Sequence, residues 1–282
     1  MKPSFFFYAN PYQPRSIEAA QSLCGEMKKR GAAVYAEDWL AERGVGDGAF
    51  LSSLPEGIRA VAVFGGDGTM LRCAPDAARQ HLPLLGVHTG TVGFLMPGDA
   101  DQPEAIADLL LQSKCPEAEY PLLRIRCQGQ EYLCVNDVSM TRGEHPGVIE
   151  VIAEADGELL FRAHGDGAVV STPLGCTAYG LAAGGPMVRP DVDCLLVTPL
   201  CARELLLRPV ILPLSAQVSL SVHGQERRRL QLAIDGQILL PITDDTRVEI
   251  DRAEERLRLI HPSRQRFFDT LRQKQAIWNQ SE

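Results

Sequence analysis

The sequence lacks an excess of positive charge. Its 282 residues hold 28 lysines and arginines against 36 aspartates and glutamates, which gives a formal net charge of −8 at pH 7. A broad binding face for nucleic acid or anionic lipid needs a field of cations. The composition therefore excludes an extended nucleic-acid or membrane-binding face, and it leaves room for local basic pockets.

Cysteine pairs with metal-binding spacing are also missing. No C-x-x-C pair occurs, and the cysteines stand mostly among apolar neighbours, which is typical of reduced thiols buried as small hydrophobes. We therefore expect no zinc site. The eight cysteines are Cys24, Cys73, Cys115, Cys127, Cys134, Cys176, Cys194 and Cys201.

Long hydrophobic runs are absent as well. The apolar run "FFFYA" is stopped by Asn10 and Pro11, short of a signal-peptide core, and no other stretch reaches a membrane-spanning length. We expect a cytoplasmic protein without a membrane partner. The glycosylation sequon at residues 279–281 is then a chance match.

Three familiar catalytic or phosphate-binding motifs do not occur. The chain has no G-x-x-x-x-G-K-[ST], no complete G-x-G-x-x-G and no G-x-S-x-G. These absences exclude a P-loop, a dinucleotide fingerprint and a serine held in a nucleophile elbow.

The first part of the chain alternates strand and helix signals, and its length allows one or two domains. Short apolar strands separated by helices predict crossover connections and a parallel sheet, so we expect an α/β domain over residues 1–118. The strand candidates are residues 4–9, 32–37, 58–64 and 82–87, and the helix candidates are residues 17–29 and 104–111.

From about Tyr120 the signals change to closely spaced strands. Many short strands separated by turns predict an antiparallel, sandwich-like domain, which we assign to residues 119–262. The expected strands are residues 122–127, 131–142, 147–155, 158–164, 167–172, 194–199, 216–224, 229–235, 246–251 and 256–261.

The tail, residues 263–282, returns to helical spacing. Phe267, Leu271 and Trp278 share one face, and Arg264 lies elsewhere on the helix. We favour a closing helix packed on the first domain over a membrane-surface helix, because the protein as a whole is acidic.

A glycine-rich turn follows a strand-like run in "AVFGGDGTML", residues 62–71. Glycines there allow positive φ angles and bring backbone N–H groups close to a ligand. Asp67 in this turn would repel a polyphosphate unless a divalent cation intervenes or the carboxylate accepts a hydroxyl proton. Both cases indicate phosphoryl transfer, and the alternative is an ordinary tight turn at Asp67-Gly68.

Two further stretches carry polar groups in apolar surroundings. In residues 164–188, glycines bracket Asp166, and Thr177 is expected to cap a short helix that ends at residues 184–185. The alternative is a strand-turn-helix corner with no ligand. Asn136 and Asp137 are placed in mid-strand, where they either contact a base edge and ribose hydroxyls or form a bulge or an exposed strand face.

Together these stretches resemble the NAD kinase family, whose members transfer a phosphoryl group from ATP, or in some members inorganic polyphosphate, to the adenosine ribose 2′-hydroxyl of NAD. The G-G-D-G-T turn is shared with lipid kinases and sugar phosphofructokinases, whereas the S-T-P-x-G-x-T-A-Y segment is more particular and carries the resemblance. The matching segments are residues 65–72, 86–95, 136–137, 166–186 and 235–237.

The resemblance implies roles for individual residues. Asp67 matches the proton acceptor of the family, and Asn136 and Asp137 match residues that contact the adenosine part of NAD. Mg²⁺ or another divalent cation is implied to arrive with the phosphate donor, with no metal ligand from the protein. The other positions implied in nucleotide binding are Gly65, Gly66, Gly68, Thr69, Arg72, His164, Asp166, Thr177, Ala178, Tyr179, Ala182 and Gln237.

The resemblance also implies a fold and partners. The expected fold is an α/β N-terminal nucleotide-binding domain plus a β-rich sandwich-like C-terminal domain that binds NAD, with the site in the cleft between them and a final helix returning to the first domain. The expected partners are NAD and ATP or polyphosphate, and further copies of the chain in a homodimer or homotetramer that completes the site.

Several residues depart from the family pattern. His88 stands where the family usually has Asn, and Asp137 is one methylene shorter than the usual Glu. Leu174 and Cys176 replace two hydroxyl side chains, and each lost hydrogen bond is expected to cost about 0.5 to 1.5 kcal/mol. Pro75 is expected to delay or kink the helix after the glycine turn.

We therefore predict an NAD kinase in which Asp67 orients and deprotonates the 2′-hydroxyl while a divalent cation bridges the donor phosphates. Two alternatives are a lipid kinase that uses the same turn and a catalytically weak NAD(P)-binding regulator. The first predicts a hydrophobic acceptor cleft, and the second is favoured by His88, Asp137 and Leu174.

Overall fold

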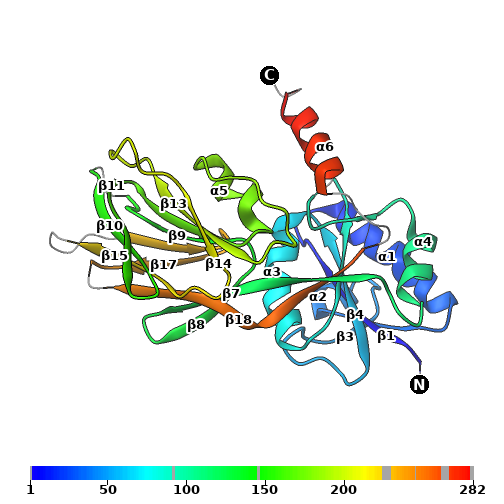
Figure 1. Cartoon of the computed structure of the whole chain (residues 1–282). Helices are drawn as coiled ribbons and strands as arrows, with labels where there is room; N and C mark the ends of the chain where they lie inside the picture. Colours follow the sequence, from blue (N-terminus) through cyan, green and yellow to red (C-terminus); the bar gives the residue numbers. More distant parts are fainter. Residues whose placement is uncertain are drawn as a thin grey trace. The chain divides into compact units, whose positions relative to one another are not determined.

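The computed structural model describes residues 2–90, 93–144, 147–223, 230–244, 246–261 and 267–279. The chain divides into two compact units, one formed by Met1–Glu119 with Leu257–Glu282 and the other by Tyr120–Arg256. Figure 1 shows the elements of both units along the chain. The strands β7 (Glu117–Cys127) and β18 (Arg247–Ile260) carry the chain across the two unit boundaries.

The first unit is built on a parallel sheet. Its neighbouring strands run in the order β5-β4-β1-β2-β3, and the last residues of β18 join the free side of β5 through the pair Leu259 and Leu84. The two-residue strand β6 (Gly98–Asp99) is also parallel to β5. The main strands are β1 (Ser4–Ala9), β2 (Ala33–Ala36), β3 (Asp47–Gly48), β4 (Ile58–Gly65) and β5 (Leu84–His88).

Helices cover the sheet, so its strands are apolar on both faces. Figure 1 shows α1 and α4 side by side, and their side chains share one hydrophobic cluster with Phe5 and Phe7 of β1. Phe6, which points to the opposite face of the same strand, is also fully buried. The helices of this unit are α1 (Pro14–Lys29), α2 (Asp38–Ala41), α3 (Asp67–Arg79), α4 (Pro103–Leu110) and α6 (Phe267–Asn279).

The second unit is a sandwich of antiparallel strands. One sheet has the order β14-β13-β12-β9-β16-β17, and the other joins β11-β10-β15-β18 and the pair β7 and β8. Alternate residues of both sheets form one core cluster, in which Met140 of β9 lies with Val151 of β10 and Leu220 of β15. The fold class predicted from the sequence, an α/β domain with a β-rich sandwich, is confirmed.

Most strands of the second unit are short. Besides β7 and β18 they are β8 (Gln130–Cys134), β9 (Asp137–Thr141), β10 (Ile149–Ala155), β11 (Glu158–Gly165), β12 (Gly167–Ser171), β13 (Cys194–Leu200), β14 (Val210–Pro213), β15 (Val218–His223), β16 (Leu230–Ile234) and β17 (Ile238–Ile242). Two short helical turns, η1 (Gly175–Thr177) and α5 (Tyr179–Ala182), follow β12.

Several sequence-based bounds differ from the structure. The segments 246–251 and 256–261 are one continuous strand, β18, whereas residues 131–142 are two strands, β8 and β9. Strands β14 and β17 were not expected. The second unit ends at Arg256 rather than at residue 262, because the end of β18 pairs with β5 of the first unit.

The C-terminal helix α6 begins at Phe267. The Phe267 ring lies 6.2 Å from the ring of Phe94, and Leu271 is 6% exposed. Arg264 and the side chain of Trp278, which the sequence placed on this helix, lie outside the described residues. In the described part of the chain, no helix is both long enough and apolar enough to cross a membrane.

The pair Phe7 and Phe64 tests the core of the first unit. Their ring centroids lie 5.1 Å apart and both side chains are fully buried. Phe7→Ala is expected to lower the free energy of unfolding by about 3 to 5 kcal/mol, because it removes apolar contact and leaves a cavity. Phe50→Ala, at a ring that is 61% exposed, should change it by less than about 0.5 kcal/mol. Urea unfolding checks both values, and equal losses would contradict this packing.

Candidate active-site residues

The G-G-D-G-T turn lies between β4 and α3. Gly65 is buried with φ +154°, and a Cβ there would lie 2.9 Å from the Cβ of Thr69. This position therefore requires glycine for both conformation and space. Gly66 is the N-cap residue of α3 in an extended conformation, and the exposed Gly68 stands in the first turn of the helix.

Helix α3 begins directly at Asp67. The N–H groups of Thr69 and Met70 donate to the carbonyl of Gly66 at 2.9 and 3.2 Å, which closes the first turn. The late start expected from Pro75 is therefore wrong, and Pro75 lies in the helix interior. Arg72 is exposed one turn further along the helix.

The carboxylate of Asp67 is held by the loop that follows β5. Its Oδ2 accepts the N–H of Phe94 at 3.1 Å, and its Oδ1 accepts the N–H of Leu95 at 3.0 Å. A Cβ on Gly93 would lie 2.7 Å from the carboxyl carbon of Asp67, so only glycine fits beside this carboxylate. The loop therefore fixes the orientation of the carboxylate at the end of the strand.

In the second unit, Asn136 and Asp137 form a corner between two strands. Strand β8 ends at Cys134 and β9 begins at Asp137, so the prediction of a mid-strand position is wrong. The strand breaks because the Asp235 carboxylate draws successive backbone N–H groups toward itself. It accepts those of Val135 at 2.8 Å, Asn136 at 2.6 Å and Asp137 at 3.2 Å.

Asp235 occupies the hairpin between β16 and β17. It has φ +51° and is followed by Gly236 with φ +62°, so an Asp-Gly pair in the left-handed conformation opens the three-residue connection between the two strands. The N–H of Gln237 donates to the carbonyl of Ile234 at 2.9 Å, and the Gln237 side chain is exposed. Burial raises the pKa of Asp235, while its three backbone N–H partners act in the opposite direction.

The Asp137 carboxylate is 6% exposed. Burial raises its pKa to about 7, and the neighbouring charge of Asp235 adds to the rise. A hydrogen bond from the backbone N–H of Tyr179 acts in the opposite direction. The structure therefore brings Asp137 together with the segment that carries Thr177, Ala178 and Tyr179.

The corner is also braced by the S-T-P segment. The hydroxyl of Thr172 donates to the carbonyl of Val135 at 2.8 Å and accepts the N–H of Gly175 at 2.9 Å. A Cβ on Gly175 would collide with the backbone of Asn136, so the two segments are in direct backbone contact. This backbone contact by itself requires glycine at position 175, so the glycine of the motif does not imply a bound ligand.

The prediction that Thr177 caps a helix is wrong. Thr177 is the last residue of η1, and the cap position of α5 belongs to Ala178, which makes no side-chain cap bond. The side chain of Tyr179 is 43% exposed, and Ala182 at the end of α5 is exposed as well. Helix α5 ends at Ala182, two residues before Gly184, which has φ +84°.

Asp166 and His164 lie at the end of β11 with partners that the sequence did not indicate. Asp166 Oδ1 accepts a hydrogen bond from Arg142 Nε at 2.8 Å. His164 donates its backbone N–H to the Glu204 carboxylate, and its Nδ1 lies 3.0 Å from Glu204 Oε1. The His164 hydrogen bond lowers the pKa of Glu204.

Two of the residues that depart from the family pattern are buried and pack inside the second unit. Leu174 is 9% exposed and Cys176 is 1% exposed. The Cys176 sulfur accepts the N–H of Val188 at 3.1 Å, and its side chain packs with Cys194 and Leu196. The thiol therefore replaces a hydroxyl on the inner side of this segment.

A metal centre made only of protein ligands is not found in the described residues. No group of three or more histidine, cysteine, aspartate or glutamate side chains there could hold a metal ion. The carboxylates of Asp67 and Asp235 accept hydrogen bonds from backbone N–H groups, and the carboxylate of Asp166 pairs with Arg142.

Sequence reasoning did not assign Gly93, Asp235, Arg142 or Glu204. Two of these carried a usable signal, because Gly93 lies within the segment 86–95 and Asp235 opens an Asp-Gly hairpin turn. Arg142 and Glu204 carried none, since their partners Asp166 and His164 lie 24 and 40 residues away in sequence.

Comparison with known proteins identifies the class of enzyme. Residues 5–114 match the family model of the ATP-NAD kinase N-terminal domain, and residues 135–262 match that of the ATP-NAD kinase C-terminal domain. These matches define a phosphotransferase with two characteristic domains. A curated NAD kinase of Thiobacillus denitrificans is 33% identical over 272 residues, covering 93% of each chain. One from Geotalea daltonii is 30% identical over 275 residues, covering 95% of this chain and 96% of the relative. The chain belongs to the NAD kinase family.

Solved structures share the fold. Yeast NADH kinase, solved with NADH, aligns with a TM-score of 0.85 at 22% identity, covering 96% of this chain and 86% of the other. The NAD kinase of Archaeoglobus fulgidus, solved with ATP, aligns with a TM-score of 0.71 at 19% identity, covering 96% and 99%. At these identities the likeness concerns the fold alone.

Gly93→Ala tests the contact that orients Asp67. The added methyl group would press on the carboxylate, so we expect the free energy of unfolding to fall by about 1 to 3 kcal/mol. Gly90→Ala is the matched control in the same segment, because a Cβ there would meet only Gln13 Nε2 at 3.6 Å. Urea unfolding of both variants measures the difference. Equal losses would show that Gly93 is not constrained by Asp67.

The raised pKa of Asp137 should make the free energy of unfolding depend on pH. Its pKa of about 7 in the folded protein lies above the ordinary value of 3.8 for an aspartate, so the folded protein keeps a proton that the unfolded chain has released. The contribution of Asp137 to the free energy of unfolding should therefore fall as pH rises from about 4 to 7, by up to roughly 4 kcal/mol, and then level off. Urea unfolding across this range should show a shallower slope for Asp137→Asn. An identical slope in both proteins would contradict the assignment.

Proposed function

We propose that this protein phosphorylates the 2′-hydroxyl of the adenosine ribose of NAD, giving NADP, with ATP or polyphosphate as donor. The observation that carries the proposal is the Asp67 carboxylate, held by the Phe94 and Leu95 N–H groups directly after a parallel strand. Membership of the NAD kinase family supplies the acceptor and the reaction.

Asp67 is proposed as the group that receives the proton of the 2′-hydroxyl. Its oxygens are fixed by backbone hydrogen bonds, so the carboxylate does not have to reorganise when the hydroxyl arrives. The first turn of α3 and the glycines Gly65, Gly66 and Gly68 leave little side-chain bulk beside it. N–H groups at a helix start favour the negative charge of phosphate, and Thr69 and Arg72 are proposed to line the same turn.

The NAD-binding residues are proposed from the second unit. Asn136 is proposed to bind the adenine edge, and Asp137 the ribose hydroxyls. Since its pKa is about 7, Asp137 is near half protonation at neutral pH and can both donate and accept there. The remaining proposed contacts are His164, Asp166, Thr177, Ala178, Tyr179, Ala182 and Gln237.

A divalent cation, Mg²⁺ in the simplest case, is proposed to enter bound to the donor phosphates. Mg²⁺ keeps several of its waters and is commonly held by substrate phosphates with few protein ligands. When bound, the cation neutralises charge on the phosphates that react.

A homodimer or homotetramer in the cytoplasm is proposed as the working form. The loop between β13 and β14 exposes two consecutive leucines, Leu205 at 84% and Leu206 at 91%. Adjacent exposed apolar side chains of this size are typical of a surface that meets another protein.

Two alternatives make different predictions. A lipid kinase offers no use for the Asn136 corner or the segment of Thr177, and the family assignment argues against it. A weak NAD(P)-binding regulator would bind NAD without turnover. Incubating the purified protein with NAD, Mg²⁺ and either ATP or polyphosphate, and then measuring NADP, separates these cases and identifies the donor.

Asp67→Asn tests the proposed proton acceptor. An amide cannot take the proton of the hydroxyl, so kcat should fall by about 10² to 10⁴-fold. The NAD dissociation constant should change little, because the proposed NAD contacts lie in other segments. Steady-state kinetics and calorimetric NAD titration measure the two quantities.

Asp76→Asn is the matched control on the same helix, where the carboxylate pairs with Arg79 at 3.0 Å. This variant should keep the wild-type kcat. A wild-type kcat in Asp67→Asn would remove Asp67 from the mechanism.

A further inference from the structure

A cavity opens at the end of the first unit's sheet where the parallel strands begin. Its volume is about 480 Å³, within the range of small-ligand sites. The strand β4 begins at this cavity with Ile58 and ends at Gly65, seven residue steps or about 23 Å away at 3.3 Å per step. The cavity is therefore separate from the turn that carries Asp67.

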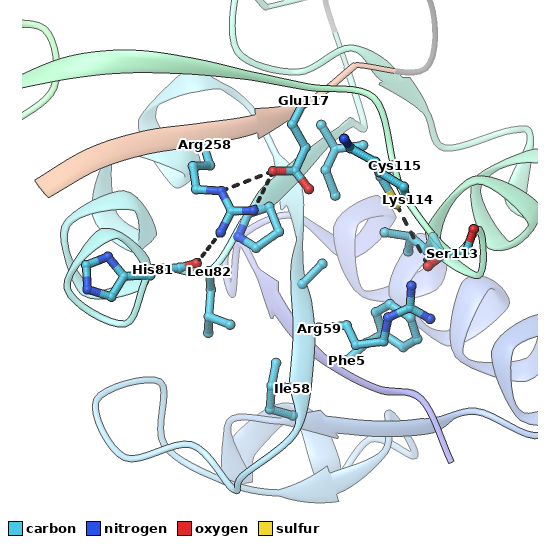
Figure 2. A pocket seen from close by; sticks show the side chains of 14 residues that line it. Phe5, Ile58, Arg59, His81, Leu82, Ser113, Lys114, Cys115, Glu117 and Arg258 are labelled. Carbon is cyan, nitrogen blue, oxygen red and sulfur yellow. Dashed lines mark hydrogen bonds and ion pairs between the residues drawn. The ribbon is translucent and has the colours of Figure 1, made fainter. Parts of the chain in front are cut away.

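Both apolar and polar side chains line the cavity, and Figure 2 labels ten of the lining residues. We call the apolar lining side chains the floor and the polar ones the rim. Both sets come from the beginnings of β1, β4 and β5, the connection from α4 to β7 and the end of β18. The floor residues are Phe5, Ile58, Ala60, Leu82, Pro83, Leu110 and Ile260, and the rim residues are Arg59, His81, Ser113, Lys114, Cys115, Glu117 and Arg258.

The rim has an excess of positive charge. Its charged side chains are the cations Arg59, Lys114 and Arg258 and the carboxylate Glu117, so the formal charge of these four side chains is +2. Burial raises the pKa of the Cys115 thiol, so Cys115 stays neutral and adds no negative charge. In a protein with a net charge of −8, this is a local basic pocket.

Arg258 has a structural role in the rim. Its Nη2 lies 2.7 Å from Glu117 Oε2, and its Nη1 donates to the carbonyl of His81 at 2.6 Å. Figure 2 shows this guanidinium between the two partners. The pair with Glu117 neutralises Arg258, so the net charge of +2 belongs to Arg59 and Lys114.

Two contacts position the Arg59 guanidinium. Its Cζ lies 5.9 Å from the centroid of the Phe5 ring, and its Nη2 donates to the carbonyl of Gln112 at 2.5 Å. A guanidinium has five N–H groups, and its planar shape matches a carboxylate or phosphate. Lys114 lies in the connection from α4 to β7 and has no ion pair or hydrogen bond with the described residues.

We propose that this cavity binds a small organic dianion, a phosphomonoester or a dicarboxylate whose apolar body lies on the floor. Two unneutralised cations match two negative charges, and the floor of Phe5, Leu110 and Pro83 matches an apolar body. The proposal does not depend on the phosphoryl-transfer function, because none of these residues belongs to the Asp67 turn or to the proposed NAD contacts.

Calorimetric titration of the full chain with four probe molecules tests separately whether binding needs the ligand's negative charge and its apolar body. Phenyl phosphate and phthalate carry both features, inorganic phosphate lacks the apolar body, and benzyl alcohol lacks the charge. We expect phenyl phosphate or phthalate to bind at least tenfold more tightly than the other two, and the tighter of them identifies phosphomonoester or dicarboxylate. Equal binding of benzyl alcohol or of inorganic phosphate would overturn the proposal, as would no binding of either aromatic dianion.

Charge-removing variants locate the binding. Arg59→Gln with Lys114→Gln should weaken the tighter aromatic dianion at least tenfold, whereas the control Lys28→Gln with Lys29→Gln, which removes two charges from α1, should bind as the wild type does. Ser113→Trp, which fills the rim without changing its charge, should also weaken binding. All three proteins should keep the wild-type rate of NADP formation, so loss of binding is distinct from loss of function. Wild-type affinity in both cavity variants would overturn the proposal.

Discussion

The two hydrogen bonds to the Asp67 carboxylate constrain the whole carboxyl edge of the parallel sheet. They come from Phe94 and Leu95, 27 and 28 residues further along the chain. For them to form, β4 must end in the conformation that only Gly65 supplies, and the loop must approach through Gly93 without a Cβ. The strand, the helix start and the loop are therefore specified together, and the orientation of one acidic side chain depends on all three.

A second acid organises the other unit in a similar way. Asp235 stands in a hairpin turn and binds the N–H groups of Val135, Asn136 and Asp137, which ends β8 and starts β9. The burial that this produces raises the pKa of Asp137 to about 7. Asp67 and Asp137 thus have the same side chain in different surroundings, and carboxylates in such different environments commonly serve different roles in one enzyme.

The sequence predicted those features that depend on neighbouring residues. The continuous apolar runs of β1 and β4 and the amphipathic α1 were recognisable, because both faces of a parallel strand and one face of a helix are apolar. The break at Asn136 was not, because the group that causes it is a carboxylate 99 residues away. The late helix start expected from Pro75 was wrong. The first turn of the helix is closed by hydrogen bonds to the Gly66 carbonyl, and Pro75 lies further along the helix and does not disturb them. The partners of Asp166 and His164 likewise depend on how β11 meets distant segments, which no local pattern records.

The proposed reaction transfers a phosphoryl group to one particular hydroxyl of NAD. The most direct measurement is the ³¹P NMR spectrum of the products formed from NAD and Mg²⁺ with the phosphate donor. We expect a new phosphomonoester signal whose phosphorus couples to the hydrogen on C2′ of the adenosine ribose. A monoester signal coupled to any other position, or NAD that remains unchanged in the presence of both ATP and polyphosphate, would contradict it.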